Sequence, residues 1–141
     1  MAESMDNERI KARLLRIEEY GTRLRKIVPS SFAAYSKSEF VLKNAVERNL
    51  QLVSDMQFDI LFLIYKGLEF RLEGNENSLL EGLKNKLGQH VAEKVGERRL
   101  LRNMLIHAYN DNTYDETAYK QAKNTEDLGE FRNAVMRILE K

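Results

Sequence analysis

The sequence predicts an all-α protein, folded as a bundle of about four or five helices. Three observations indicate this class. Apolar residues recur at steps of three and four along most of the chain, residues that typically start or stop helices separate these stretches, and the 141 residues include one proline. The length corresponds to a single domain.

The first predicted helix spans about residues 6–28. Its apolar residues alternate steps of four and three, which is typical of one face of an amphipathic helix. They are Ile10, Leu14, Ile17, Gly21, Leu24 and Val28. Pro29 then ends the helix, because proline cannot continue it and disfavours helical geometry in the residue before it.

A second, longer helix is predicted from Phe40 onward. Ser36 and Glu39 fit a capping box, in which each side chain satisfies a backbone N–H of the first turn. The apolar run from Phe58 to Tyr65 could by itself be a buried strand. No turn residue occurs between Phe40 and Lys66, however, which favours one continuous helix.

Around residues 58–68 this helix is apolar on nearly every side, and such a surface has to be covered. One cover is the rest of the same chain, which would make this a buried central helix. The other is a second subunit, which would make residues 58–68 a dimer surface. The sequence leaves both alternatives open.

The remaining elements are predicted from their caps and turn residues. Ser78 is expected to cap a short helix that closes at Gly88, and a longer helix follows over about residues 90–106. A break is predicted over residues 110–116, which are rich in side chains that hydrogen-bond their own backbone. A terminal helix opens at residues 124–127.

Charge and composition exclude several classes of protein. The chain has 23 Lys+Arg against 22 Asp+Glu, so binding of nucleic acid through bulk positive charge is excluded and any such contact must be local. The absence of cysteine excludes disulfides and thiol nucleophiles. No signal peptide and no apolar run of membrane-spanning length is visible, so we expect a cytoplasmic protein without membrane contact.

One segment, residues 98–109, combines three arginines, an amide, an imidazole and a phenol. On a helix, Arg102 and Tyr109 point the same way, roughly 10 Å apart. Arg98 precedes Arg102 by four residues and extends the same stripe.

Asn103 and His107 share a second face of this helix by the same spacing of four. On a continuous helix, His107 lies about 140° around from Arg102. Both can reach one ligand only if the helix ends near Ile106 or if a partner chain completes the site. The turn residues that follow favour a helix end.

The motif Arg102-x4-His107-x-Tyr109 resembles the Arg-x4-His-x-Tyr signature of the HepT-like toxins, a branch of the HEPN superfamily of all-α ribonucleases. Residues 45–55 are similar to the second helix of that family, with Asp55 where glutamate is commoner. Asn103, after the motif arginine, fits the family pattern of a polar residue there. The order of helices matches along the chain, so residues 1–141 resemble a single HepT-like HEPN domain.

This resemblance implies a homodimer whose two motifs meet across the interface and cut RNA, either tRNA or mRNA, without a metal. It implies the toxin of a type VII toxin–antitoxin pair, silenced by a MntA-type nucleotidyltransferase antitoxin that adds AMP to Tyr109. Carried over to this chain, Arg102 and His107 are the catalytic pair. Asp55 and Asn103 support them, and no DNA binding is expected.

The residue chemistry agrees with this role. Cleavage of RNA by its own 2′-hydroxyl needs a proton acceptor, a proton donor and stabilisation of charge on the phosphorus. Imidazole is the side chain that titrates nearest neutral pH, so His107 is the natural acid–base. Arg102 is the natural clamp, because a guanidinium directs two donors at phosphate oxygens. A two-fold dimer would supply the second histidine.

Other interpretations of the same residues remain. Arg98 and Arg99 could contact RNA, but ion pairs with Glu93 or Glu97, or exposure to solvent, are favoured.

Two carboxylates lie on the long apolar helix, and a buried carboxylate needs a partner. Asp55 or Asp59 could orient His107 or an arginine, or could pair with Arg48 or Lys66.

Neither a metal nor a cofactor is expected, because no cluster of metal ligands surrounds His107 and no glycine-rich phosphate loop occurs. The rival function is a non-catalytic subunit that binds nucleotide or presents substrate to a nucleotidyltransferase. A structural helical adaptor is a third alternative.

Overall fold

The computed structural model describes residues 5–70, 75–107 and 112–140. The described residues form seven α-helices and one 3-10 turn, with no strand among them. The helices are α1 (Asn7–Ile27), α2 (Phe32–Ser36), α3 (Phe40–Gly67), α4 (Glu76–Leu87), α5 (Gln89–Ile106), α6 (Asp115–Lys123) and α7 (Glu126–Leu139). The predicted all-α class is confirmed, and the helix count exceeds the expectation because α2 and α6 are short additional helices.

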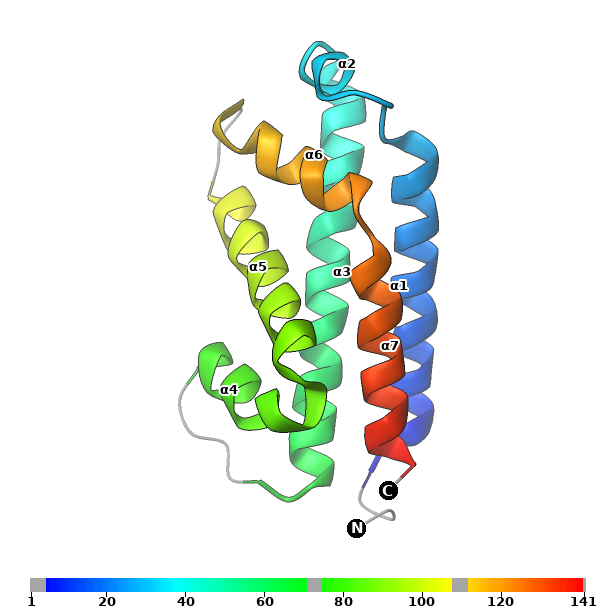
Figure 1. The fold of residues 1–141 in the computed structure, drawn as a ribbon, viewed down its shortest axis with the longest axis vertical. Helices are drawn as coiled ribbons and strands as arrows, with labels where there is room; N and C mark the ends of the chain where they lie inside the picture. Colours follow the sequence, from blue (N-terminus) through cyan, green and yellow to red (C-terminus); the bar gives the residue numbers. More distant parts are fainter. Residues whose placement is uncertain (1–4, 71–74, 108–111, 141) are drawn as a thin grey trace.

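Helix α3 forms the centre of the molecule (Figure 1). The long helix α1 packs along one side of it, and α5 packs along the other side. Helix α7 lies beside α1, α6 crosses the end of the bundle where α2 lies, and α4 lies at the opposite end next to α3 and α5. None of the described helices has the length and hydropathy needed to cross a membrane.

Helix α1 forms as the spacing of its apolar residues predicts. The Asp6 side chain caps it by accepting a hydrogen bond from the backbone N–H of Arg9 at 3.2 Å. The predicted apolar face is buried from Ile10 to Leu24. The helix ends at Ile27, and Val28 is extended before Pro29, as proline requires of the preceding residue.

The predicted capping box at Ser36 and Glu39 is wrong. Ser31 caps a short helix instead, with its hydroxyl accepting from the backbone N–H of Ala34 at 3.1 Å, and Ser36 is the last residue of that helix. Tyr35 is fully buried and anchors α2 to the core. Glu39 is the N-cap of α3 without a side-chain capping bond.

The apolar segment 58–68 is a buried central helix and not an exposed dimer surface. Its side chains fill the core of the same chain: Phe58 is 6% exposed, and Ile60, Leu61 and Ile64 are 0% exposed. Phe62 is the large apolar side chain of this segment that is exposed, at 41%. Of the two covers that the sequence left open, the rest of the same chain covers most of this segment.

The junction between α4 and α5 is made by Gly88, whose φ of 93° few other residues adopt at low cost. Gly88 ends α4 as predicted and is also the N-cap of α5. The start of α4 differs from the prediction: Asn75 is its N-cap, and Ser78 lies inside the helix and donates its backbone N–H to the Asn75 side chain at 3.3 Å.

Helix α6 begins at Asp115, inside the predicted break of residues 110–116. Ala118 and Ala122 are fully buried, and Tyr119 packs against the ring of Tyr35 with ring centroids 5.7 Å apart. The Asp115 carboxylate accepts a hydrogen bond from Nζ of Lys43 at 2.9 Å. These contacts attach α6 to α2 and α3.

Candidate functional site

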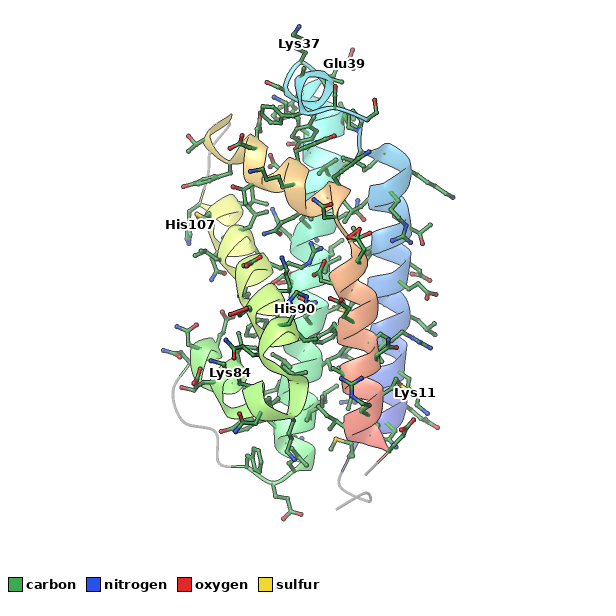
Figure 2. The ribbon with its side chains drawn as sticks, viewed as in Figure 1. Lys11, Lys37, Glu39, Lys84, His90 and His107 are labelled. Carbon is green, nitrogen blue, oxygen red and sulfur yellow. The ribbon has the colours of Figure 1, made fainter. Side chains whose placement is uncertain are left out.

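Helix α5 carries Arg98, Arg99, Arg102 and Asn103 of the predicted site residues, and its three arginines have different surroundings. Arg98 faces α7, while Arg99 and Arg102 face a carboxylate of α3. His107 lies at the end of α5 and His90 at its beginning (Figure 2). The helix ends after Ile106, as the sequence required for Arg102 and His107 to reach one ligand.

Arg98 is a structural residue. Its side chain is 4% exposed, and its Nε and Nη2 donate to the two carboxylate oxygens of Asp127 at 2.7 and 2.8 Å. Nη2 also donates to the backbone carbonyl of Asn124 at 3.1 Å. A buried, bidentate pair of this kind ties α5 to the beginning of α7. The expected ion pairs of Arg98 with Glu93 or Glu97 are wrong, because the guanidinium is buried against Asp127 of α7.

Arg99 is held by two carboxylates. Its Nε donates to Glu76 at 3.0 Å, and its Nη1 donates to Oδ1 of Asp55 at 3.1 Å. The guanidinium also lies over the ring of Phe58, 4.5 Å from the ring centroid. The hydrogen bond from Arg99 holds the pKa of the Glu76 carboxyl below its ordinary value. The predicted pairing of Arg99 with Glu93 or Glu97 is wrong: its partners are Glu76 and Asp55.

Asp55 orients the motif arginine. Its Oδ1 accepts hydrogen bonds from Nε of Arg102 at 2.9 Å and from Nη1 of Arg99. Of the alternatives that the sequence left open, the structure therefore selects an arginine as the partner of Asp55. Asp59 does not share this role, because it pairs with Arg13 at 3.5 Å.

Arg102 is half-buried and held on two sides. Besides its bond to Asp55, its Nη1 donates to Oδ1 of Asn103 at 3.1 Å. Its side chain is 25% exposed, and Nη2 makes no hydrogen bond to the described residues. The guanidinium is thus oriented by protein contacts while part of it faces outward. This is the arrangement expected of a preorganised cation that binds an anionic group.

His107 is exposed and lies where the helical geometry stops. Its backbone φ of −105° and ψ of 1° depart from the helix, and its N–H donates to the carbonyl of Met104 at 3.2 Å. The imidazole therefore lies at the exposed C-terminal end of α5. Tyr109, the predicted modification site, lies outside the described residues.

Sequence reasoning missed Glu76 as part of this cluster. It is one of the two carboxylates that hold Arg99, and it comes from the first turn of α4. Within the described residues, no group of three or more histidine, aspartate or glutamate side chains is placed to hold a metal ion.

The chain matches one known family. Residues 17–138 match the model of the family described as Ribonuclease HepT-like. Neither the search of curated proteins nor that of solved structures found a match. The matched segment covers α3 and α5, which contain the cluster of Asp55, Arg99 and Arg102, and it also includes His107. The chain therefore belongs to the HepT-like family of ribonucleases.

Proposed function

We propose that this protein is a metal-independent endoribonuclease and the toxin of a type VII toxin–antitoxin pair, with Arg102 and His107 as its catalytic residues. The observation that carries the proposal is the position of Arg102. Asp55 and Asn103 hold its guanidinium, and His107 follows at the exposed end of the same helix. Because the chain belongs to a ribonuclease family, RNA is the substrate that we expect the Arg102 guanidinium to bind.

The proposed reaction is transfer of the phosphodiester to the neighbouring 2′-hydroxyl. The 2′-oxygen attacks phosphorus as its proton passes to an imidazole, and the bond from phosphorus to the 5′-oxygen breaks as that oxygen gains a proton. The products are a 2′,3′-cyclic phosphate and a 5′-hydroxyl. Arg102 would stabilise the charge that develops on the non-bridging oxygens, and His107 would transfer protons.

The reaction needs a proton acceptor and a proton donor, which favours a homodimeric site. Each chain offers one histidine at the end of the helix that carries Arg102, and a two-fold axis close to His107 would supply a second. Ile106, between the two motif residues, is 44% exposed and would be buried in such an interface.

Whether each active site of the dimer uses residues of both subunits can be tested by mixing subunits. Wild-type and His107→Ala protomers are mixed in varying ratios under conditions that allow subunit exchange. If each site needs His107 from both subunits, the mixed dimers are inactive, and the cleavage rate should fall with the square of the wild-type fraction. A rate that falls only in proportion to the wild-type fraction would contradict a shared site.

The regulatory part of the proposal concerns Tyr109. A MntA-type nucleotidyltransferase would add AMP to its hydroxyl, two residues beyond His107. The added phosphodiester would place negative charge near the Arg102 guanidinium and compete with RNA for it. Modification would thus block the site without unfolding the protein.

The test of the ribonuclease activity uses both histidines of the chain. Purified protein is incubated with RNA in the presence of EDTA, alongside His107→Ala and His90→Ala variants. His90 is a matched control because it lies at the other end of α5 and pairs with Glu130 at 3.1 Å. We expect cleavage by the wild type and by His90→Ala, and none by His107→Ala. Nucleotide binding without RNA cleavage would instead identify a non-catalytic partner subunit of a nucleotidyltransferase.

A further inference from the structure

A cavity of about 510 Å³ lies between α5 and α6, on a different side of α5 from the cluster of Asp55, Arg99 and Arg102. Leu100, Leu101 and Met104 of α5 form an apolar wall, and Thr117, Lys120 and Gln121 of α6 form a more polar one. The volume lies in the range of sites that bind small molecules or single nucleotide units. None of these residues has a part in the reaction proposed above.

The face of α5 that borders the cavity leads toward His107, which is not itself one of the lining residues. Leu100, Met104 and His107 are spaced by four and three residues, so they lie on one face of α5. Along the axis of α5, Leu100 lies roughly 10 Å from His107. This distance is little more than the spacing of neighbouring nucleotides in an extended strand. Leu100 is 61% exposed although it borders a cavity. A large apolar side chain in this position can stack on a ligand.

Two polar atoms of cavity residues have no hydrogen-bond partner within the described residues. The side-chain nitrogen of Gln121 donates to the backbone carbonyl of Glu97 at 3.2 Å, which orients the amide and leaves Oε1 as a buried acceptor. Nη1 of Arg98 is likewise a buried donor without a hydrogen-bond partner in the described part of the chain. Nε and Nη2 of the same guanidinium donate to Asp127. The cavity residues thus offer one donor and one acceptor that the described chain does not use.

The charge of the cavity favours a polyanion. Lys94 pairs with Glu97 at 3.6 Å, and the charge of Arg98 is balanced by Asp127. Lys120 makes no ion pair within the described part of the chain. The cavity residues therefore carry one positive charge in excess, which fits a ligand with a phosphate beside it.

We propose that the cavity between α5 and α6 is a subsite for one unpaired base of the RNA substrate, within about one or two nucleotides of the scissile phosphate. The apolar wall of Leu100 and Met104 would stack on the base, and every nucleobase edge presents a donor beside an acceptor to match Gln121 and Arg98. This inference rests on the proposed ribonuclease function and adds a substrate requirement to it.

The subsite implies that cleavage occurs in single-stranded segments or loops. A base inside a duplex is stacked and paired on both sides, and it reaches a protein cavity only after unstacking. The enzyme therefore selects its cleavage positions by the availability of an unpaired base near the phosphate, in addition to the phosphate contact of Arg102.

The test uses synthetic RNA in which single positions lack a base. An unstructured oligonucleotide is first cut by the wild-type protein to locate the scissile bond, and failure of this step contradicts the ribonuclease function. Abasic nucleotides are then placed one at a time around that bond. We expect one position within one or two nucleotides of it where removal of the base lowers kcat/KM about tenfold or more.

Two variants assign that effect to the cavity. Thr117→Trp places an indole at its mouth, and Gln121→Leu removes its free acceptor, while Asn133→Trp on the exposed face of α7 is the control. For both cavity variants, cleavage of the intact oligonucleotide should fall toward the rate that the wild type shows on the abasic one, with no further loss on the abasic RNA. The Asn133→Trp variant should lose as much cleavage rate on the abasic RNA as the wild type does.

Two results would overturn the subsite: abasic substitutions that change the rate less than about twofold, or cavity variants that stay as sensitive to base removal as the wild type. A crosslinking arm separates the two proposals. A bound oligonucleotide carrying 4-thiouridine should crosslink to peptides of α5 and α6 that line the cavity, whether or not RNA is cut. Crosslinks confined to other helices would exclude the subsite even for an active ribonuclease.

Discussion

Oδ1 of Asp55 accepts a hydrogen bond from Nε of Arg102 over 2.9 Å, and these two residues lie 47 positions apart in the chain. The bond joins α3 to α5 at the point where the motif arginine turns outward. The same oxygen also accepts from Arg99. The aspartate is therefore long enough to reach Arg102, although glutamate is commoner at this position in the family that the sequence resembles.

The first prediction concerns Asp55 as a positioning residue. Asp55→Ala removes the acceptor of Arg102 and Arg99 and should lower kcat/KM for RNA cleavage by about 100-fold, because a displaced catalytic group costs this much. Asp55→Glu should restore most of the rate. Asp59→Ala is the control, since Asp59 pairs with Arg13 on α1. Equal losses in Asp55→Ala and Asp59→Ala would contradict the role.

The second prediction separates two arginines that lie one helical turn apart. Arg98→Met leaves Asp127 charged and buried without its partner, which should lower the free energy of unfolding by about 3–5 kcal/mol. Arg102→Met removes a partly exposed cation and should cost about 1 kcal/mol or less while abolishing cleavage. Urea denaturation of both variants measures the difference. The reverse order of stabilities would refute this assignment of roles.

The third prediction concerns Glu47, a half-buried carboxyl where α2, α3 and α6 meet. Burial, followed by the negative charge of Asp115, raises the pKa of the Glu47 carboxyl, and Lys43 opposes this shift. Burial also raises the pKa of the Tyr35 hydroxyl, with Glu47 and Asp115 adding to the effect. The folded protein thus holds the Glu47 proton more tightly than the unfolded chain does.

A raised carboxyl pKa contributes stability below the unfolded value, and this contribution is lost as pH rises through the folded value. Glu47→Gln should therefore be more stable than the wild type at pH 7, and the gain should shrink as pH falls through the raised pKa of folded Glu47 and be gone below the ordinary value of 4.5. Thermal melts from pH 3.5 to 8, with Glu18→Gln as the control, measure it. A gain that is independent of pH would show that charge at position 47 is not its cause.

The fourth prediction concerns Tyr109. Co-expression with a MntA-type nucleotidyltransferase should add an adenylyl group to the wild type, visible by intact-mass measurement. Tyr109→Phe lacks the acceptor hydroxyl, so it should keep RNA cleavage, gain no mass and escape neutralisation. Equal silencing of Tyr109→Phe would mean that modification of this tyrosine is not the inhibitory mechanism.

The long helices were predictable because their apolar spacing is local information. The periodicity from Ile10 to Leu24 and the absence of turn residues between Phe40 and Lys66 define α1 and α3. The end of α5 after Ile106 followed from the turn-forming residues downstream. Helix α6 was missed because its sequence is mostly polar and its buried face consists largely of small alanines.

The partners of the charged residues were not predictable in the same way. Ser36 was assigned as a cap because its spacing to Glu39 fits, but burial of Tyr35 stabilises a short helix that includes Ser36. The sequence offered several possible cationic partners for Asp55. Its contact with Arg102 depends on how α3 packs against α5. The pairing of Arg98 with Asp127 likewise depends on the position of α7.

The proposed cleavage requires Arg102 and His107 to act together on one phosphodiester. The direct test is the RNA cleavage rate, in EDTA, of the wild type, Arg102→Gln, His107→Ala and the double variant. Each single change should lower kcat by roughly 100-fold or more. The kcat of the double variant should be no lower than that of the less active single variant, because the two residues act in one step. Losses that multiply in the double variant, or single variants that cleave at the wild-type rate, would contradict it.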